Sequence, residues 1–524
     1  MDDNIVFENY KLTTKKKLLN AILIGYFSTS QQVTFGKNKS GKTIYLIKPF
    51  NDSLPNILVA YGGKLKGKLI ITFKITNNLL INENSNDKTN NIILHGEILN
   101  IIGFMDDSNL LITLQYIYEI NRKNIINVYN NNYEKNIIRP LINKTIFSID
   151  PIGCIDIDDA ISFEKYDEYY LVTIYIAQPI CFLSEEILVQ RSKTAFSTLY
   201  NNFNENYDSI NNLWGNNITN NSSFIKNYER NAYCIEFYIC NINFKIEKII
   251  NYPAKIINKI QTNYDDCLKY EIIEKFYEFS KKLDYSISNT HELISFWMIK
   301  TNNELGKLDE FKNLNIPYRI MKNTYQLNNG DIKSEFTNII NHDIKKLFLS
   351  RISESASYSL NNTFNYHSAL NIHNYIHFTS PIRRIIDSLI HWCITYNINF
   401  KELIEKYNID LNHINFLDKA TKKYHQSINM LNNIDIIFKD LNDDDYLEFK
   451  GYIYKKSIIK NKWTIYFKEI GFQKVKMWDY KLDYLIDKSI INDINIGDEY
   501  IFQIYKKKSF LPNDKILIVN TIFI

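Results

Sequence analysis

The sequence predicts an α+β protein in which small β-barrels flank a central region that carries a cluster of acidic residues. Short runs of β-branched and aromatic residues, separated by turn residues, occur near both ends of the chain and are typical of small barrels. Between them, four aspartates are followed by an apolar run at residues 169–177 that we expect to be a strand. The pattern therefore places the candidate chemistry in the centre of the chain.

The composition is that of an ordinary globular protein and sets few limits on function. The chain has 524 residues, 45% of them hydrophobic and 23% charged, which suggests about three or four domains. A net charge of +4 neither identifies nor excludes a nucleic-acid-binding protein. Six cysteines without a C-x-x-C pair are typical of reduced thiols. Because neither a signal peptide nor a transmembrane run is apparent, we expect a cytoplasmic chain with no membrane partner. We also expect a monomer.

Four aspartates with the spacing D-x5-D-x-D-D lie in residues 148–162: Asp150, Asp156, Asp158 and Asp159. The interleaved Ile149, Ile155 and Ile157 indicate a partly buried backbone, so we expect the carboxylates to converge in a cleft. Carboxylates that converge repel one another unless a proton or cation lies between them, and Mg2+ or Mn2+ prefers oxygen ligands. Such ions serve in-line displacement at phosphorus. A calcium loop is the alternative, but the Gly and Glu positions of an EF-hand are never met together.

Residues 148–162 resemble the first signature of the ribonuclease II / ribonuclease R family, and residues 377–392, which begin H-F-T-S-P-I-R-R, resemble its second. The resemblance implies an RNB-type α+β catalytic domain at residues 136–436. It also implies a cold-shock/OB-like RNA-binding barrel at 29–135 and a C-terminal OB-type RNA-binding barrel at 446–524. Residues 1–28 are basic and are expected to form a helical lead-in.

The activity that this resemblance implies is metal-dependent, 3′-to-5′ hydrolysis of single-stranded RNA to 5′-nucleoside monophosphates, with Mg2+ or Mn2+ as cofactor. The four aspartates would hold the metal, and Asp158 would also position the water or the terminal sugar. Arg383 would act in catalysis by pairing with the scissile phosphate, and Asp387 would hold an arginine in place. The implied RNA-binding residues are Tyr200, Tyr264, Arg383 and Arg384.

The chain departs from the family pattern at four positions where the family has acidic residues or residues around the site. Here these positions hold Gln178, Ser295, Phe296 and Gln426. These changes keep a second hypothesis open, in which the chain is a catalytically impaired RNA-binding protein that retains the RNB fold. Phe296 and Trp297 could stack on a base or belong to the core of a helix. The four aspartates are intact, so we expect an enzyme.

Two further motifs suggest other chemistry. Residues 36–43 match the P-loop pattern G-x4-G-K-[ST], but that motif requires a helix after it, whereas β-branched and aromatic residues and Pro49 follow. We expect a basic hairpin loop that touches RNA phosphate, and no nucleotide cofactor. Four histidines lie close in sequence, and zinc binding competes there with hydrogen bonding in the core or to phosphate: His367, His373, His377 and His391.

Overall fold

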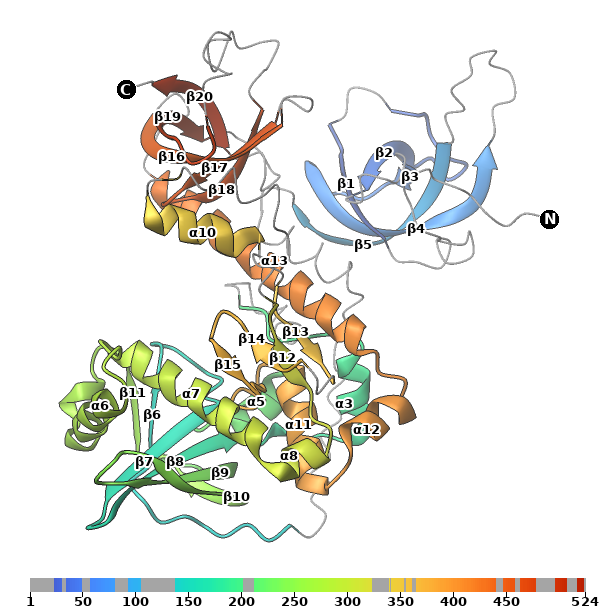
Figure 1. The fold of residues 1–524 in the computed structure, drawn as a ribbon. Helices are drawn as coiled ribbons and strands as arrows, with labels where there is room; N and C mark the ends of the chain where they lie inside the picture. Colours follow the sequence, from blue (N-terminus) through green and yellow to red (C-terminus); the bar gives the residue numbers. More distant parts are fainter. Residues whose placement is uncertain are drawn as a thin grey trace. The chain divides into compact units, whose positions relative to one another are not determined.

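The computed structural model describes residues 23–30, 34–49, 57–80, 93–104, 137–200, 212–322, 339, 341–352, 355–360, 364–439, 446–457, 462–476, 495–506 and 516–522. The chain divides into two compact units (Figure 1). One comprises residues Lys123–Thr337 and Lys345–Lys422, and the other comprises Met1–Arg122, Asn338–Ile344 and Lys423–Ile524. No helix within the described ranges is long and apolar enough to cross a membrane.

Five strands near the N-terminus close into a barrel in the order β1-β2-β3-β5-β4. Their bounds are β1 Leu23–Ser28, β2 Thr43–Pro49, β3 Ile57–Tyr61, β4 Lys68–Leu80 and β5 Ile93–Phe104. β1 pairs with β4 in antiparallel fashion and β3 pairs with β5 in parallel, which closes the barrel. The core inside contains Phe27, Ile47, Ile71 and Phe73. A five-stranded closed barrel is the OB-type architecture expected here.

The barrel begins earlier than the sequence predicts. The helical lead-in expected at residues 1–28 is wrong for Leu23–Ser28, which form β1 and pair with both β2 and β4. Ile24 and Phe27 of this strand are buried in the barrel, so pairing with two neighbouring strands outweighs the local helical pattern. Residues 1–22 lie outside the described residues.

The P-loop match is a hairpin loop, as predicted. β2 begins at Thr43, so a strand and not a helix follows the motif. The Asn38 backbone N–H donates to the Lys42 carbonyl at 2.9 Å, and the Asn38 side chain accepts from the Lys42 N–H at 2.9 Å. A phosphate-binding helix N-terminus is absent here, which removes the structural basis of the P-loop alternative.

The central unit contains a six-stranded sheet with the order β10-β9-β8-β7-β6-β11. Its strands are β6 Phe147–Asp150, β7 Asp159–Lys165, β8 Tyr169–Ala177, β9 Glu229–Cys240, β10 Ile246–Ile257 and β11 Ile260–Asn263. All neighbours are antiparallel except β11 and β6. The strand predicted at residues 169–177 is confirmed as β8, and its last seven residues are buried.

The register of this sheet collects the candidate residues at one edge. Phe147 of β6 pairs with Ile161 of β7, so the end of β6 at Asp150 meets the chain just before β7. β11 runs parallel to β6 and ends at Asn263, the partner of Asp150. The end of β6, the start of β7 and the end of β11 therefore share one edge of the sheet.

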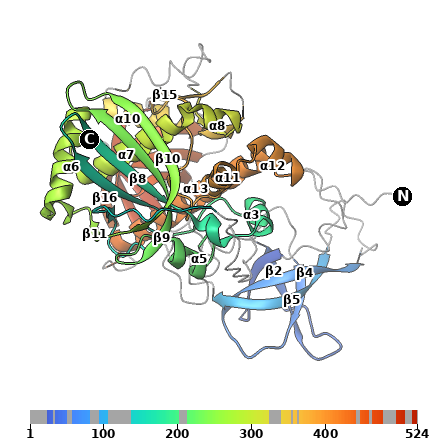
Figure 2. The same cartoon turned by 90° about the horizontal axis from the view of Figure 1, so that it is seen from below.

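Two helices, α6 Glu271–Leu283 and α7 Thr290–Lys307, cover one face of this sheet (Figures 1 and 2). Phe276 of α6 lies 5.6 Å from Phe163 of β7, and Trp297 of α7 lies 5.9 Å from Phe237 of β9, between ring centroids. α7 begins after Asn289, whose side chain accepts from the Glu292 N–H and so satisfies a donor that the helix leaves free.

The remaining helices of the described residues lie between β8 and β9 in sequence or after β11, and α13 is the longest of them. The helices are η1 Pro179–Phe182, α3 Glu185–Ser192, α5 Asn216–Ser222, η3 Cys267–Lys269, α8 Asp309–Asn313, α10 His342–Ile352, α11 Ile385–Tyr396, α12 Phe400–Lys406 and α13 Leu411–Ile437. Two strand pairs complete the set: β12 Tyr318–Ile320 with β13 Ser357–Ser359, and β14 Tyr366–His367 with β15 Ile372–His373.

The C-terminal part forms a five-stranded antiparallel sheet with the order β18-β17-β16-β19-β20. The strands are β16 Tyr446–Ser457, β17 Lys462–Phe467, β18 Gly471–Lys476, β19 Glu499–Lys506 and β20 Ile516–Ile522. Its core includes Ile465 and Phe502, together with Phe438, which follows α13. Gly497 precedes β19 with φ at +94°, and a Cβ there would lie 2.4 Å from Ile339, so only glycine fits this turn.

Candidate active site

The loop from β6 to β7 carries the acidic cluster. It turns at residues 151–154, where the Cys154 N–H donates to the Pro151 carbonyl at 3.1 Å and Gly153 adopts φ +80°, as the third residue of a type II turn requires. The expected burial holds for Ile149 and Ile157 but is wrong for Ile155, which is 55% exposed. The reason is that residues 151–158 form a loop, so no strand alternation extends across them.

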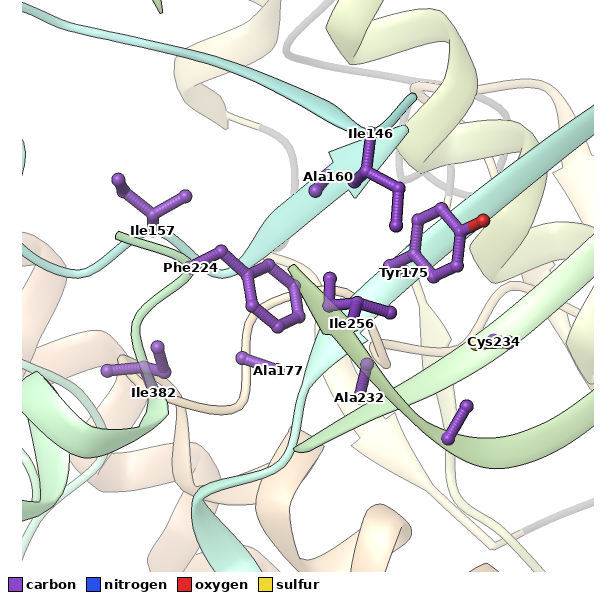
Figure 3. Packing of buried hydrophobic residues seen from close by; sticks show 11 residues of the cluster. Ile146, Ile157, Ala160, Tyr175, Ala177, Phe224, Ala232, Cys234, Ile256 and Ile382 are labelled. Carbon is purple, nitrogen blue, oxygen red and sulfur yellow. The ribbon is translucent and has the colours of Figure 1, made fainter. Parts of the chain in front are cut away.

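A shared apolar core brings the two signatures together. Ile157 of the first signature and Ile382 of the second belong to one buried cluster, and both lie on the same side of the Phe224 ring (Figure 3). The Ile382 N–H donates to Asp158 Oδ1 at 2.7 Å. Arg383 Nε lies 3.2 Å from Asp158 Oδ2. The Asp158 carboxylate is nearly inaccessible, with 4% of its side chain exposed, whereas 45% of the Arg383 side chain is exposed.

The two neighbouring arginines have different surroundings. Arg383 also donates from Nη2 to Ser380 Oγ at 2.8 Å and keeps part of its guanidinium accessible. Arg384 is paired at 2.9 Å with Asp387, which is fully buried and accepts from the Ser380 N–H as well. The prediction that Asp387 holds an arginine is confirmed, and that arginine is Arg384. Its expected contact with RNA stays a prediction.

Burial disfavours the ionised form of three aspartates of the cluster, Asp150, Asp158 and Asp159. Burial, followed by the nearby charge of Asp159, raises the pKa of Asp150 to about 8. Burial raises the pKa of Asp159 to about 6, although the positive charge of Arg383 opposes it. Burial also raises the pKa of Asp158, again against Arg383. The three carboxyl groups therefore bind protons more tightly than aspartates in water, and a cation would relieve the same cost.

Both predicted tyrosines lie beside the aspartates. Tyr200 Oη donates to Asp156 Oδ2 at 2.5 Å, while 49% of the residue is exposed. Tyr264 follows β11 and stacks on His291 with 3.6 Å between ring centroids and 20° between the planes. Burial, then Asp159 and Asp150, raise the pKa of Tyr264 to about 12. Two separate segments of the chain thus each place a tyrosine next to the acidic residues.

The negative charge of the acidic cluster would be offset by a divalent cation. The assignment of metal ligands to Asp150, Asp156, Asp158 and Asp159 stays a prediction. In the part of the chain that the structure describes, no group of three or more His, Cys, Asp or Glu side chains is arranged to hold a metal ion. Two buried oxygens of the cluster, Asp150 Oδ2 and Asp158 Oδ2, have no hydrogen-bond partner among these residues, and the second lies 3.2 Å from Arg383 Nε. Mg2+ is commonly held by only one or two carboxylates, with water and substrate phosphate as its other ligands. Carboxylate oxygens are the ligand type that Mg2+ and Mn2+ prefer, and the cofactor itself stays a prediction.

Sequence reasoning missed two asparagines that hold the site segments in place. Asn302 of α7 accepts from the Phe378 N–H at 2.8 Å and donates to Thr379 Oγ1 at 3.2 Å. Asn258 donates to Ser148 Oγ at 3.1 Å and to the Phe224 carbonyl at 2.7 Å. Both are buried. For Asn258 the available signal was a lone amide in the largely apolar segment 256–260, which requires buried partners if it lies inside the protein. Asn302 stands in the polar run 300–304 and gave no such signal.

The departures from the family pattern lie apart from the acidic cluster in their contacts. Gln178 is buried, accepts from Arg139 and donates to Thr395 Oγ1 at 3.2 Å. Ser295 and Gln426 are exposed on α7 and α13. Trp297 is 1% exposed and donates to Ser280 Oγ at 2.8 Å, which confirms that it belongs to the helix core. Phe296 is half-buried and lies edge-on against Trp297.

Two of the four histidines, His377 and His391, make hydrogen bonds in the core, which is one of the alternatives to zinc binding. His391 Nε2 lies 2.9 Å from the Phe378 carbonyl, and His377 Nδ1 lies 2.6 Å from Tyr358 Oη. Burial lowers the pKa of His391 to about 3 and that of His367 to about 4. These groups and His373 form no metal site within the described residues.

Comparison with known proteins shows a match to one family over part of the chain and similar solved structures. The sequence profile of the RNB domain matches residues 270–399, which include the second signature. A search of curated protein sequences returned no match.

Solved structures are similar over most of the chain. RNase R of Mycoplasma genitalium in its apo form has a TM-score of 0.72 at 16% identity, covering 96% of this chain and 90% of that one. The same enzyme in complex with ribose-methylated single-stranded RNA has a TM-score of 0.70, with the same identity and coverage. Yeast Ssd1, a pseudonuclease, has a TM-score of 0.58 at 12% identity, covering 87% of this chain and 65% of that one. Residues 270–399 thus match the RNB-domain family, and the chain as a whole has an RNase R-like fold.

Proposed function

We propose that this chain is a metal-dependent exoribonuclease that hydrolyses single-stranded RNA from its 3′ end and releases 5′-nucleoside monophosphates. The observation that carries the proposal is the contact of Asp158 with Ile382 and Arg383, which joins a buried acidic cluster to a partly exposed guanidinium. The similar RNase R was solved with single-stranded RNA, which supports RNA as the substrate class.

The residues of the site suit the parts of such a reaction. Arg383 presents a planar guanidinium that can pair with the scissile phosphate, and its contacts with Asp158 and Ser380 orient it. Tyr200 and Tyr264 offer rings beside the aspartates on which the last nucleotides can pack.

A divalent cation completes the proposal. Asp150 and Asp159 are the strongest candidates to hold it, because their pKa values are raised by burial and Asp150 has an oxygen atom without a hydrogen-bond partner among the described residues. When bound, Mg2+ or Mn2+ supplies a Lewis acid that neutralises phosphate charge and lowers the pKa of water.

An RNA-binding protein without activity is the second candidate, and the likeness to the pseudonuclease Ssd1 favours it. The contacts of Gln178 speak against this reading, because Arg139 and Thr395 and not the acidic cluster surround it. Ser295 and Gln426 are exposed on helices. The altered positions thus leave the Asp158–Arg383 arrangement intact.

The deciding experiment is degradation of a 5′-labelled single-stranded RNA with Mg2+. We expect a ladder of shortened fragments and 5′-monophosphate products from the wild type, loss of both in EDTA, and at least a 100-fold slower reaction for Asp158→Asn, the size typical of removing one catalytic electrostatic group. Asp309→Asn is the matched control, since Asp309 is an exposed aspartate on α8.

Three results would contradict the proposal. Shortening from the 5′ end or internal cleavage would exclude the direction, and full activity in EDTA would exclude the metal. RNA binding without shortening by the wild type would establish the binding-protein alternative.

A further inference from the structure

A polar cavity of about 450 Å³ lies in the central unit between the β12–β13 strand pair and the first turns of α13. Its lining contains two lysines, Lys322 and Lys419, and two aromatic residues, Phe416 and the buried Tyr358, together with Ile320 and with serine and asparagine residues. None of the residues assigned above to the acidic cluster or to RNA contact lines it. The cavity is therefore a separate feature of the same unit.

The sequence builds the cavity by two simple periodicities. Ser355, Ser357 and Ser359 are alternate residues in and beside β13, so an extended chain directs them to one face. On α13, the lining residues recur at helical spacing at Asn412, at Asn415 and Phe416, and at Lys419, which places them on one face of the helix.

A reciprocal pair of hydrogen bonds holds these two faces together. The Tyr358 N–H donates to Asn415 Oδ1 at 2.7 Å, and Asn415 Nδ2 donates to the Tyr358 carbonyl at 3.0 Å. The side-chain amide of Asn415 thus pairs with the backbone of β13 as a neighbouring strand would. These two hydrogen bonds fix α13 against β13 at the wall of the cavity.

The charge of the cavity is positive. Neither Lys322 nor Lys419 forms an ion pair with any described residue, and Lys322 Nζ lies 5.9 Å from the Phe364 ring. The nearest acidic residue in sequence, Asp418, is buried on another side of α13 and is already paired with Arg319 at 2.7 Å and Lys422 at 3.0 Å. The lysines therefore have positive charge available for an anion.

The aromatic ring is equally available. Phe416 is 46% exposed, and a ligand that covered its apolar face would remove that surface from water. An accessible ring next to lysines is the combination that binds a base by stacking and its phosphate by charge. Hydroxyl and amide groups around them can bind ribose hydroxyls.

We propose that this cavity binds one nucleotide unit, with its base on Phe416 and its phosphate between Lys322 and Lys419. The unit belongs either to an RNA strand or to a free 5′-mononucleotide, which share this chemistry. The inference rests on the proposed function only for the origin of the nucleotide, because binding itself requires no hydrolysis.

The cavity is also linked to the segment that carries Arg383. Tyr358 is one of the residues that line it, and Tyr358 Oη lies 2.6 Å from Nδ1 of His377, the first residue of the second signature. The cavity and the candidate active site thus share one run of contacts within a single unit.

Binding in EDTA tests the inference without turnover. A fluorescent single-stranded RNA and 5′-AMP are each titrated into the full chain, as the wild type, as Phe416→Ala and as the double variant Lys322→Gln/Lys419→Gln. We expect about tenfold weaker binding of at least one ligand by each variant, in line with loss of one stacking contact or of phosphate attraction. Phe416→Tyr should retain affinity, because it keeps the ring.

The matched controls are Tyr285→Ala, an aromatic residue that is 93% exposed elsewhere, and Lys401→Gln on α12, whose side chain is 63% exposed. Weaker binding of RNA alone assigns the cavity to a strand, and weaker binding of 5′-AMP assigns it to free mononucleotide. Unchanged affinity for both ligands in folded Phe416→Ala and in the double variant would overturn the inference. Failure of the exonuclease proposal would appear separately, as an absent RNA ladder.

Discussion

The carboxylate of Asp158 lies 3.2 Å from Nε of Arg383, although the two residues belong to different signatures of the sequence. The same carboxylate accepts from the Ile382 N–H at 2.7 Å, so both of its oxygens face one short segment. Asp158 therefore orients Arg383 in addition to any role with metal. A change at either residue should disturb the same reaction.

The two neighbouring arginines should respond differently to substitution. Arg383→Lys removes a planar donor that is 45% exposed and should slow RNA degradation about 100-fold with little change in stability. Arg384→Ala leaves Asp387 buried without its partner and should lower the free energy of unfolding by about 3–5 kcal/mol. Single-turnover rates and urea denaturation measure the two effects. Equal effects of both variants on rate alone would contradict the distinction.

Stability should depend on pH through Asp150. Its pKa is about 8 in the folded protein against an ordinary value of 3.8, so the folded state binds more protons between these values. Its contribution to the free energy of unfolding is therefore complete below about pH 4 and is lost as pH rises toward 8. In EDTA, Asp150→Asn should remove this part of the pH dependence, and Mg2+ should restore stability to the wild type at pH 8.

Urea denaturation of the wild type and Asp150→Asn at several pH values between 4 and 9 measures this linkage. Asp167→Asn is the control, because Asp167 is exposed on the loop between β7 and β8. Parallel pH curves for wild type and Asp150→Asn would show that Asp150 titrates as it does in the unfolded chain.

The buried ion pair of Arg319 and Asp418 should support the central unit. Their closest atoms are 2.7 Å apart, both side chains are at most 4% exposed, and the Arg319 guanidinium lies 4.4 Å from the Tyr358 ring centroid. Asp418→Asn leaves a buried guanidinium without its counter-charge and should cost about 3–5 kcal/mol of unfolding free energy. The Lys401→Gln variant provides an exposed comparison, and a loss below 1 kcal/mol for Asp418→Asn would show that the buried charge finds another partner.

Tyr200 should act through both its hydroxyl and its ring. Tyr200→Phe removes the 2.5 Å hydrogen bond to Asp156, and bonds to charged groups are worth about 1.5–3 kcal/mol, so the reaction should slow about tenfold or more. The ring remains in this variant, so the shortest RNA fragment left at the end of the reaction should keep its length. Tyr200→Ala should change that length, which a sequencing gel reveals. Tyr228→Phe, at a residue that is 59% exposed, should leave both properties unchanged.

The sequence by itself determined the local features. Runs of β-branched and aromatic residues indicated strands near both ends and the strand at residues 169–177, which is β8, and the residues after Gly36–Thr43 indicated a strand where a P-loop needs a helix. The two signatures marked the acidic cluster and Arg383 by their residue types and spacing. Such features depend on neighbours within a few positions, which a single sequence displays.

Only the tertiary structure decided what those residues contact. Leu23–Ser28 became a strand because β2 and β4 pair with it, and Ile155 became exposed because its loop has no strand partner. The register of β6, β7 and β11 brought Asp150 and Asp159 to one edge, and the core around Phe224 placed Asp158 beside Arg383. These contacts join residues far apart in sequence, so their energies depend on packing that no local pattern contains.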